Sequence, residues 1–97
     1  MYVLAIIRYR KPVEEVVKVT EEHRAYLRGL KERKLLVASG PLDPRFGGAA
    51  LFRLPDGTPD ADVLALRDGD PFVRRGVAQW ELLPWGPVIG KEDLDRA

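Results

Sequence analysis

The chain of 97 residues contains a single histidine, His23, in the segment Glu22-His23-Arg24-Ala25-Tyr26-Leu27. Imidazole is the side chain that gains and loses a proton most readily near neutral pH, so acid–base chemistry would fall most easily to His23. A lone histidine on the apolar side of a helix is more often a core residue, hydrogen-bonded to a backbone carbonyl. A polar residue that interrupts an apolar stripe is also typical of a ligand pocket, and both interpretations of His23 fit the sequence.

Asp70 is the second candidate, within Asp68-Gly69-Asp70-Pro71-Phe72. An aspartate before a proline, followed by Gly76, is typical of the N-cap, first turn and terminal glycine of a short helix. The alternative is that Asp70 accepts a hydrogen bond from His23, which would fix the imidazole tautomer and raise its basicity. A carboxylate has two oxygens, so the two roles can coexist.

Ser39 and Gly40 form a third candidate group, in Ser39-Gly40-Pro41. The simple interpretation is the end of a strand. The alternative is that Gly40 lets a ligand approach the backbone while Ser39 presents its hydroxyl to the same pocket, although Ser39 lacks the Gly-x-Ser-x-Gly surroundings of a nucleophile. We take Arg8 as a further candidate for substrate binding. Three arginines have the charge to bind a carboxylate, although a solvated position on the surface is the simpler interpretation of each. They are Arg8, Arg45 and Arg53.

The composition excludes several kinds of chemistry. The chain has no cysteine, which excludes disulfides, thiolate catalysis, cysteine-based zinc sites and iron–sulfur clusters. One histidine excludes a histidine-rich metal site and leaves a weak carboxylate site open; we expect neither a metal nor a cofactor. With 16 Lys and Arg against 15 Asp and Glu, the net charge is +1, which argues against a nucleic-acid partner.

The length predicts one domain over residues 1–97, with a frayed polar tail over 91–97. Met1 leads into a short apolar run without a basic region or cleavage site, so we expect no secretory signal. No segment approaches the ~18 apolar residues of a membrane span. We therefore expect a cytoplasmic protein with no membrane partner.

A first strand is expected over Tyr2–Tyr9, where β-branched and aromatic residues dominate before Lys11-Pro12. Both of its faces are apolar, with Val3, Ala5, Ile7 and Tyr9 on one and Tyr2, Leu4 and Ile6 on the other. Such a strand is normally buried on both faces, and a helix layer covers only one.

One helix is expected from Pro12 to about Arg33, since Pro12 suits a first turn and the charges at the two ends complement the helix dipole. A period of 3.6 residues places its apolar side chains on one stripe that contains His23. The stripe consists of Val13, Val16, Val17, Thr20, His23, Leu27 and Leu30.

The remaining segments predict two strands, a helix, a helical turn and a last strand. The strands cover 34–42 and 49–54 and form a hairpin around the loop 43–48. The helix covers 59–68 with Thr58 as its N-cap, and Gly76 ends a turn at 72–75. The last strand covers 77–83 and is stopped by Pro84-Trp85.

The resulting order, βαββαβ, predicts an α+β, ferredoxin-like fold with a four-stranded antiparallel sheet and two helices on one face. The open face needs a cover, because the first strand is apolar on both sides. A two-fold homodimer that packs sheet against sheet supplies one and makes a dimeric α+β barrel. The pattern leaves larger oligomers open, and a monomer with a solvated sheet face fits it poorly.

Several short segments, taken together and in order, resemble the YCII-related (YciI-like) family. The resemblance runs from the first strand to Trp85 and implies an α+β barrel dimer whose pocket holds a His and an Asp, corresponding to His23 and Asp70. One branch that resembles this family dehydrochlorinates a chlorinated hydroxyhydroquinone without a cofactor, and muconolactone isomerases share the fold. Arg33 departs from the family pattern, because the family often has Gly at this position before the second strand. The segments are Glu22-His23-Arg24-Ala25-Tyr26-Leu27, Leu36-Val37-Ala38-Ser39-Gly40-Pro41-Leu42, Asp70-Pro71-Phe72, Gly76-Val77 and Pro84-Trp85.

The first functional hypothesis is a cofactor-independent acid–base enzyme, of the lyase, dehalogenase or isomerase type, acting on a small ring or lactone. His23 would move the proton and Asp70 would orient it. The alternative is a non-catalytic small-molecule-binding or dimerisation module in which His23 is structural. An RNA-recognition module shares the element order, but strand 49–54 lacks the aromatic-and-glycine signature. An acylphosphatase needs an asparagine to position water, and the chain has none.

Overall fold

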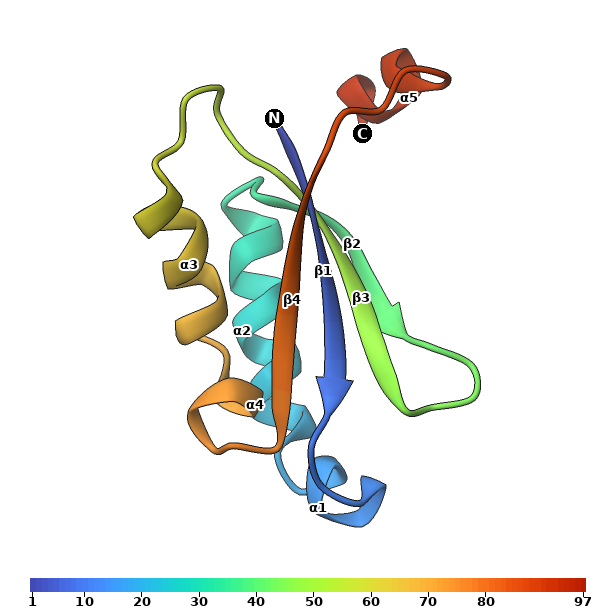
Figure 1. Cartoon of the computed structure of the whole chain (residues 1–97), viewed down its shortest axis with the longest axis vertical. Helices are drawn as coiled ribbons and strands as arrows, with labels where there is room; N and C mark the ends of the chain where they lie inside the picture. Colours follow the sequence, from blue (N-terminus) through green and yellow to red (C-terminus); the bar gives the residue numbers. More distant parts are fainter.

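The computed structural model describes all residues from 1 to 97 and contains one four-stranded antiparallel sheet in the order β2-β3-β1-β4 (Figure 1). Strand β1 (Tyr2–Tyr9) is central, between β3 (Gly47–Arg53) and β4 (Ala78–Trp85). Strand β2 (Leu36–Pro41) is an edge strand paired with β3. The predicted α+β, ferredoxin-like arrangement is confirmed.

The two longer helices, α2 (Thr20–Glu32) and α3 (Asp60–Asp68), lie on the same side of the sheet (Figure 1). The short helix α1 (Val13–Val17) precedes α2, and α4 (Pro71–Arg74) leads from α3 into β4. A last helix, α5 (Lys91–Arg96), lies beyond one end of the strands. No helix combines the length and the apolar character that a membrane crossing requires.

The core fills the space between the sheet and these helices. Alternate residues of β1, Val3, Ala5 and Ile7, are buried on this side, and Phe52 from β3 is fully buried among them. Because side chains alternate along a strand, the opposite face carries Leu4 and its cross-strand partners, Leu51 and Leu83. That second face is apolar around Leu4, as predicted for the first strand, and Leu83 remains 40% exposed.

The prediction of one continuous helix from Pro12 to Arg33 is wrong, because the helix is interrupted at Lys18 and Val19. The Thr20 hydroxyl donates a hydrogen bond to the Val16 carbonyl, four residues earlier, and such back-bonding bends helices. The break also changes the predicted apolar stripe. Val13 and Val17 are exposed, whereas Val19 is buried.

The ends of several elements also differ from the predictions. Strand β4 continues through Pro84, which an edge strand tolerates because its outer N–H groups need no partner. Helix α3 has Pro59 at its N-cap, and the predicted cap, Thr58, instead donates to the Pro55 carbonyl at 2.6 Å. The helical turn before Gly76 is confirmed as α4, and Gly76 has a positive φ of 70°.

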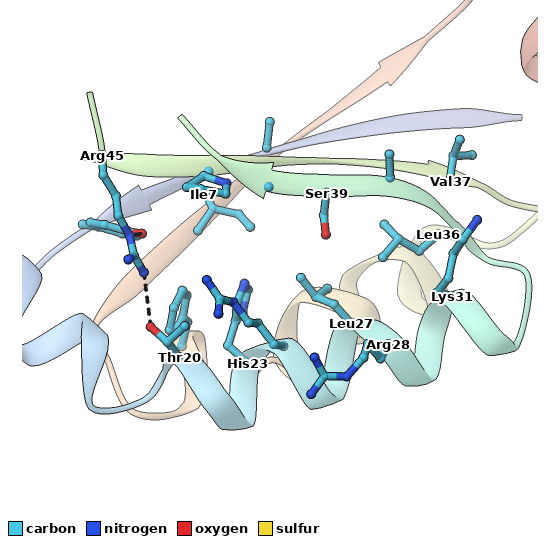
Figure 2. Close-up of a pocket in the computed structure, with 18 residues that line it drawn as sticks. Ile7, Thr20, His23, Leu27, Arg28, Lys31, Leu36, Val37, Ser39 and Arg45 are labelled. Atoms are coloured by element: carbon cyan, nitrogen blue, oxygen red, sulfur yellow. Dashed lines mark hydrogen bonds between the residues drawn. The ribbon is translucent and has the colours of Figure 1, made fainter. Parts of the chain in front are cut away.

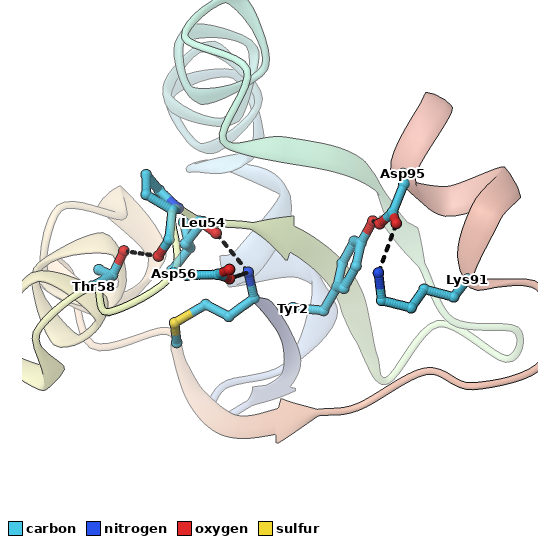
Figure 3. A network of polar contacts seen from close by, with 8 residues as sticks. Tyr2, Leu54, Asp56, Thr58, Lys91 and Asp95 are labelled. Atoms are coloured by element: carbon cyan, nitrogen blue, oxygen red, sulfur yellow. Dashed lines mark hydrogen bonds and ion pairs between the residues drawn. The ribbon is translucent and has the colours of Figure 1, made fainter.

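The segment 91–97, expected as a frayed polar tail, contains helix α5, and Asp95 connects this helix to the strands. The Tyr2 hydroxyl donates to Asp95 Oδ1 at 2.7 Å, and Lys91 Nζ lies 2.7 Å from Asp95 Oδ2 (Figure 3). The Arg53 guanidinium also donates to the Asp95 carbonyl. Tyr2 and Arg53 lie in β1 and β3, so a sequence window limited to the tail contains no sign of these two partners.

Candidate functional site

Strand β2 carries a bulge that determines which way Ser39 points. Leu36 pairs with Phe52, but Ala38 pairs with Leu51, so Val37 is an extra residue without a partner on β3. Regular alternation from the buried Leu36 would direct Ser39 to the open face of the sheet. The bulge instead places Ser39 opposite Ala50, on the helix side, as bulges near functional sites often do.

His23 and Asp70 meet, as the sequence predicted. His23 Nδ1 lies 2.7 Å from Asp70 Oδ1, and the Asp70 side chain is completely buried. Helix α2 supplies His23, and the junction between α3 and α4 supplies Asp70. The fold therefore brings together two residues that are 47 positions apart in the chain.

Asp70 also has two structural roles, as the N-cap of α4 and as the acceptor of a buried indole N–H. Its Oδ1 accepts the backbone N–H of Phe72 at 3.0 Å, which is the predicted N-cap of α4. Its Oδ2 accepts the indole N–H of Trp80 at 2.8 Å. Sequence reasoning missed Trp80 as a partner, although a buried carboxylate needs several donors and Trp80 is predicted on the strand that follows α4.

The His23 ring is held on one face by Phe72, with ring centroids 3.8 Å apart and planes within 2°. Since Nδ1 donates to the carboxylate, Nε2 is the acceptor nitrogen of the neutral ring. Nε2 has no hydrogen-bond partner in the protein. Every buried side-chain nitrogen and oxygen has such a partner, so Nε2 is not buried. Nε2 is therefore accessible to small molecules, while the rest of the ring is fixed.

His23 lines a pocket of about 380 Å³ between α2 and the sheet (Figure 2). Thr20, His23 and Leu27 project from α2 toward the strands, and Ser39 projects from β2 toward the helix. Ile7 and Phe72 add apolar walls. The volume lies within the ~300–1,000 Å³ typical of small-molecule pockets.

The other predicted substrate-binding residues have different outcomes. Gly40 lines the pocket, and a Cβ placed on it would meet no atom within 4 Å, so the chain's own packing does not require glycine there. Arg8 is not brought to the pocket, because it lies on the open face of β1 and pairs with Glu81 at 3.0 Å. Arg45 does line the pocket, close to Thr20.

Tyr26 lies one turn after His23 and donates its hydroxyl proton to the Leu66 carbonyl at 2.6 Å. Burial raises the pKa of the Tyr26 hydroxyl, and the negative charge of Asp70 raises it further. Tyr26 is therefore a neutral donor that connects α2 to α3. No three His, Asp or Glu side chains are grouped so as to hold a metal ion.

Comparison with known proteins gives a family and a fold. The model of the YCII-related domain matches residues 1–86. A similar solved structure is the 5-chloro-2-hydroxyhydroquinone dehydrochlorinase TftG from Burkholderia phenoliruptrix AC1100, in complex with 2,5-dihydroxybenzoquinone. It superposes with a TM-score of 0.74 at 20% identity, covering 91% of this chain and 96% of TftG. No curated protein matches the chain significantly in sequence.

Proposed function

The chain belongs to the YCII-related family, and from this premise we propose that its pocket is the active site of a cofactor-independent acid–base enzyme. The reaction is an elimination, dehalogenation or isomerisation of a small ring or lactone. The observation that carries the proposal is the buried contact of 2.7 Å between His23 and Asp70, which leaves Nε2 accessible at an open pocket.

The proposed mechanism assigns the proton to Nε2 of His23. Neutral His23 takes a proton from a carbon or hydroxyl of the substrate, and the electron pair left behind forms a double bond. In a dehalogenation that pair expels chloride, and in an isomerisation the double bond shifts and Nε2 returns the proton elsewhere on the ring. Asp70 holds the imidazole orientation and stabilises the imidazolium, as the carboxylate of a catalytic triad does.

The proposed substrate class is supported by the walls of the pocket and by the similar structure. Ile7, Leu27 and Phe72 supply apolar surface for one ring, and Ser39 supplies a hydroxyl that can bind a ring substituent. TftG is named for the dehydrochlorination of a chlorinated hydroquinone and was determined with a substituted benzoquinone. A single substituted ring is therefore the ligand that we propose for this chain.

The test is turnover of 5-chloro-2-hydroxyhydroquinone, measured as chloride release, and of unsaturated lactones, measured by NMR in deuterated water. We expect His23→Gln and Asp70→Asn to lower kcat by ~10²–10⁴-fold, the usual contribution of general acid–base catalysis. Arg8→Gln is the matched control outside the pocket. Equal turnover by wild type and both pocket variants would show that the pair is not catalytic.

One observation favours the alternative of a non-catalytic binding module. Asp70 caps α4 and binds Trp80, so its pairing with His23 also has a structural explanation. A ligand that raises the melting temperature of wild type and of His23→Ala equally would favour that alternative.

We also propose a homodimer formed through the open sheet face, where Leu4, Leu51 and Leu83 meet across three strands.

A further inference from the structure

The pocket is lined by basic side chains and by no acidic ones. Arg24, Arg28, Lys31 and Arg45 line it, and no Asp or Glu does. None of the four has a carboxylate within 4 Å, although six other Lys or Arg side chains of the chain do. Because the whole chain carries a net charge of only +1, this is a local excess of positive charge.

Arg45 is the most constrained of the four. Its Nε donates to the Tyr9 hydroxyl at 3.0 Å. Its Nη2 donates to the Thr20 hydroxyl at 3.3 Å, the bond drawn in Figure 2. The Thr20 hydroxyl in turn donates to the Val16 carbonyl at 3.1 Å, which fixes its orientation. Both acceptors of Arg45 are neutral, so they hold the guanidinium in place without cancelling its charge.

The position of Arg45 relates it to the proposed proton acceptor. Thr20 and His23 are three residues apart on α2, and side chains at this spacing are neighbours, with Cβ atoms ~5–6 Å apart. An anion bound by Arg45 would therefore lie beside the His23 ring. A guanidinium presents a planar fork of N–H donors that matches the two oxygens of a carboxylate.

We propose that the pocket takes a ring compound with a carboxylate substituent, and that Arg45 is the residue that binds and orients this group. The inference rests on the proposed function, because it assumes that the ring occupies the pocket with its reacting atom at Nε2 of His23. Arg24, Arg28 and Lys31 contribute a positive field that attracts the anion. Arg45 thereby determines specificity for acidic rings over neutral ones.

The experiment is an NMR titration of the isotopically labelled 97-residue chain with benzoate and with benzamide, its neutral analogue. We expect benzoate to bind wild type at least about tenfold more tightly than benzamide, since a hydrogen bond to a charged group contributes about 1.5–3 kcal/mol. Arg45→Gln should weaken the binding of benzoate by about 10- to 100-fold and leave the binding of benzamide unchanged. Arg74→Gln, an exposed arginine outside the pocket, is the matched control.

A second measurement does not depend on any variant: added salt should weaken the binding of benzoate to wild type and spare benzamide. Failure of benzoate to bind, equal affinities for the two compounds, or undiminished benzoate binding by Arg45→Gln would overturn the proposal. His23→Gln separates this inference from the proposed function. Benzoate binding that persists in this variant supports the carboxylate site even where the chain shows no turnover, and loss of binding counts against it.

Discussion

At the scale of single residues, Asp70 accepts three hydrogen bonds from three different elements. His23 comes from α2, the Phe72 N–H from α4 and the Trp80 indole from β4. The hydrogen bond with His23 serves the proposed chemistry. The bonds from Phe72 and Trp80 fix the carboxylate, so only one orientation of the His23 ring keeps its hydrogen bond to Asp70. A completely buried carboxylate without these donors would be strongly destabilising.

The first prediction concerns the indole N–H of Trp80. Trp80→Phe keeps an aromatic ring against Phe52 but leaves Asp70 Oδ2 without a donor, so we expect a loss of about 1–3 kcal/mol in the free energy of unfolding. Urea denaturation followed by circular dichroism measures it. Trp85→Phe is the control, since Trp85 is 42% exposed and donates no hydrogen bond. A similar, small effect of both substitutions would contradict the assigned role of Trp80.

The pairing of His23 with Asp70 could be predicted because it depends on residue types that are rare in the chain and on a family resemblance. The role of Trp80 could not, since a tryptophan on a buried strand position has an adequate explanation in packing alone. The orientation of Ser39 could not be derived from alternation, because one extra residue at Val37 reverses it.

At the scale of elements, the order and pairing of the strands could be predicted from apolar alternation and from glycine and proline positions. The interruption between α1 and α2 could not be predicted, because Thr20 fits the helical period. The hydrogen bond from its hydroxyl to the Val16 carbonyl depends on the side-chain rotamer, which the sequence pattern does not give. Helix α5 was missed for the opposite reason. Its anchor, Asp95, depends on Tyr2 and Arg53, which are distant in the sequence.

The second prediction is that docking of α5 depends on pH at both extremes. Hydrogen bonds from Lys91 and Tyr2 lower the pKa of Asp95, so its contribution is present above the unfolded value of about 3.9 and is lost as pH falls through the folded pKa. Burial, and then the bond to Asp95, raise the pKa of Tyr2. That contribution is present below about 10 and is lost as pH rises through the folded pKa.

Amide hydrogen exchange of α5, corrected for intrinsic rates, measures this docking. We expect protection to fall at both pH extremes in wild type, and Tyr2→Phe to reduce protection at neutral pH and to lose the alkaline step that Tyr2 causes. The amides of α2 serve as the internal control. Protection of α5 that does not change with pH would show that Asp95 does not anchor the helix.

At the scale of the whole molecule, a 97-residue chain uses one face of its sheet for the core and leaves the other without a cover. The open face is apolar near its centre, where Leu51 lies between Ala38 on β2 and Leu4 on β1. Contiguous apolar surface of this kind is typical of protein–protein interfaces. A second copy of the chain offers the same surface, so two-fold packing would cover both faces at once.

The third prediction is that Leu51→Glu converts the dimer to a folded monomer. The new carboxylates would face apolar side chains and one another across the two-fold axis, whereas in the monomer residue 51 is only half-buried and the charge can remain solvated. Sedimentation velocity gives the mass, and circular dichroism confirms folding. Val17→Glu is the matched control, because Val17 is 53% exposed on α1, away from the sheet. If wild type sediments as a monomer at high concentration, or if both variants remain dimers, the open face is not the interface, and Leu4, Leu51 and Leu83 require another explanation.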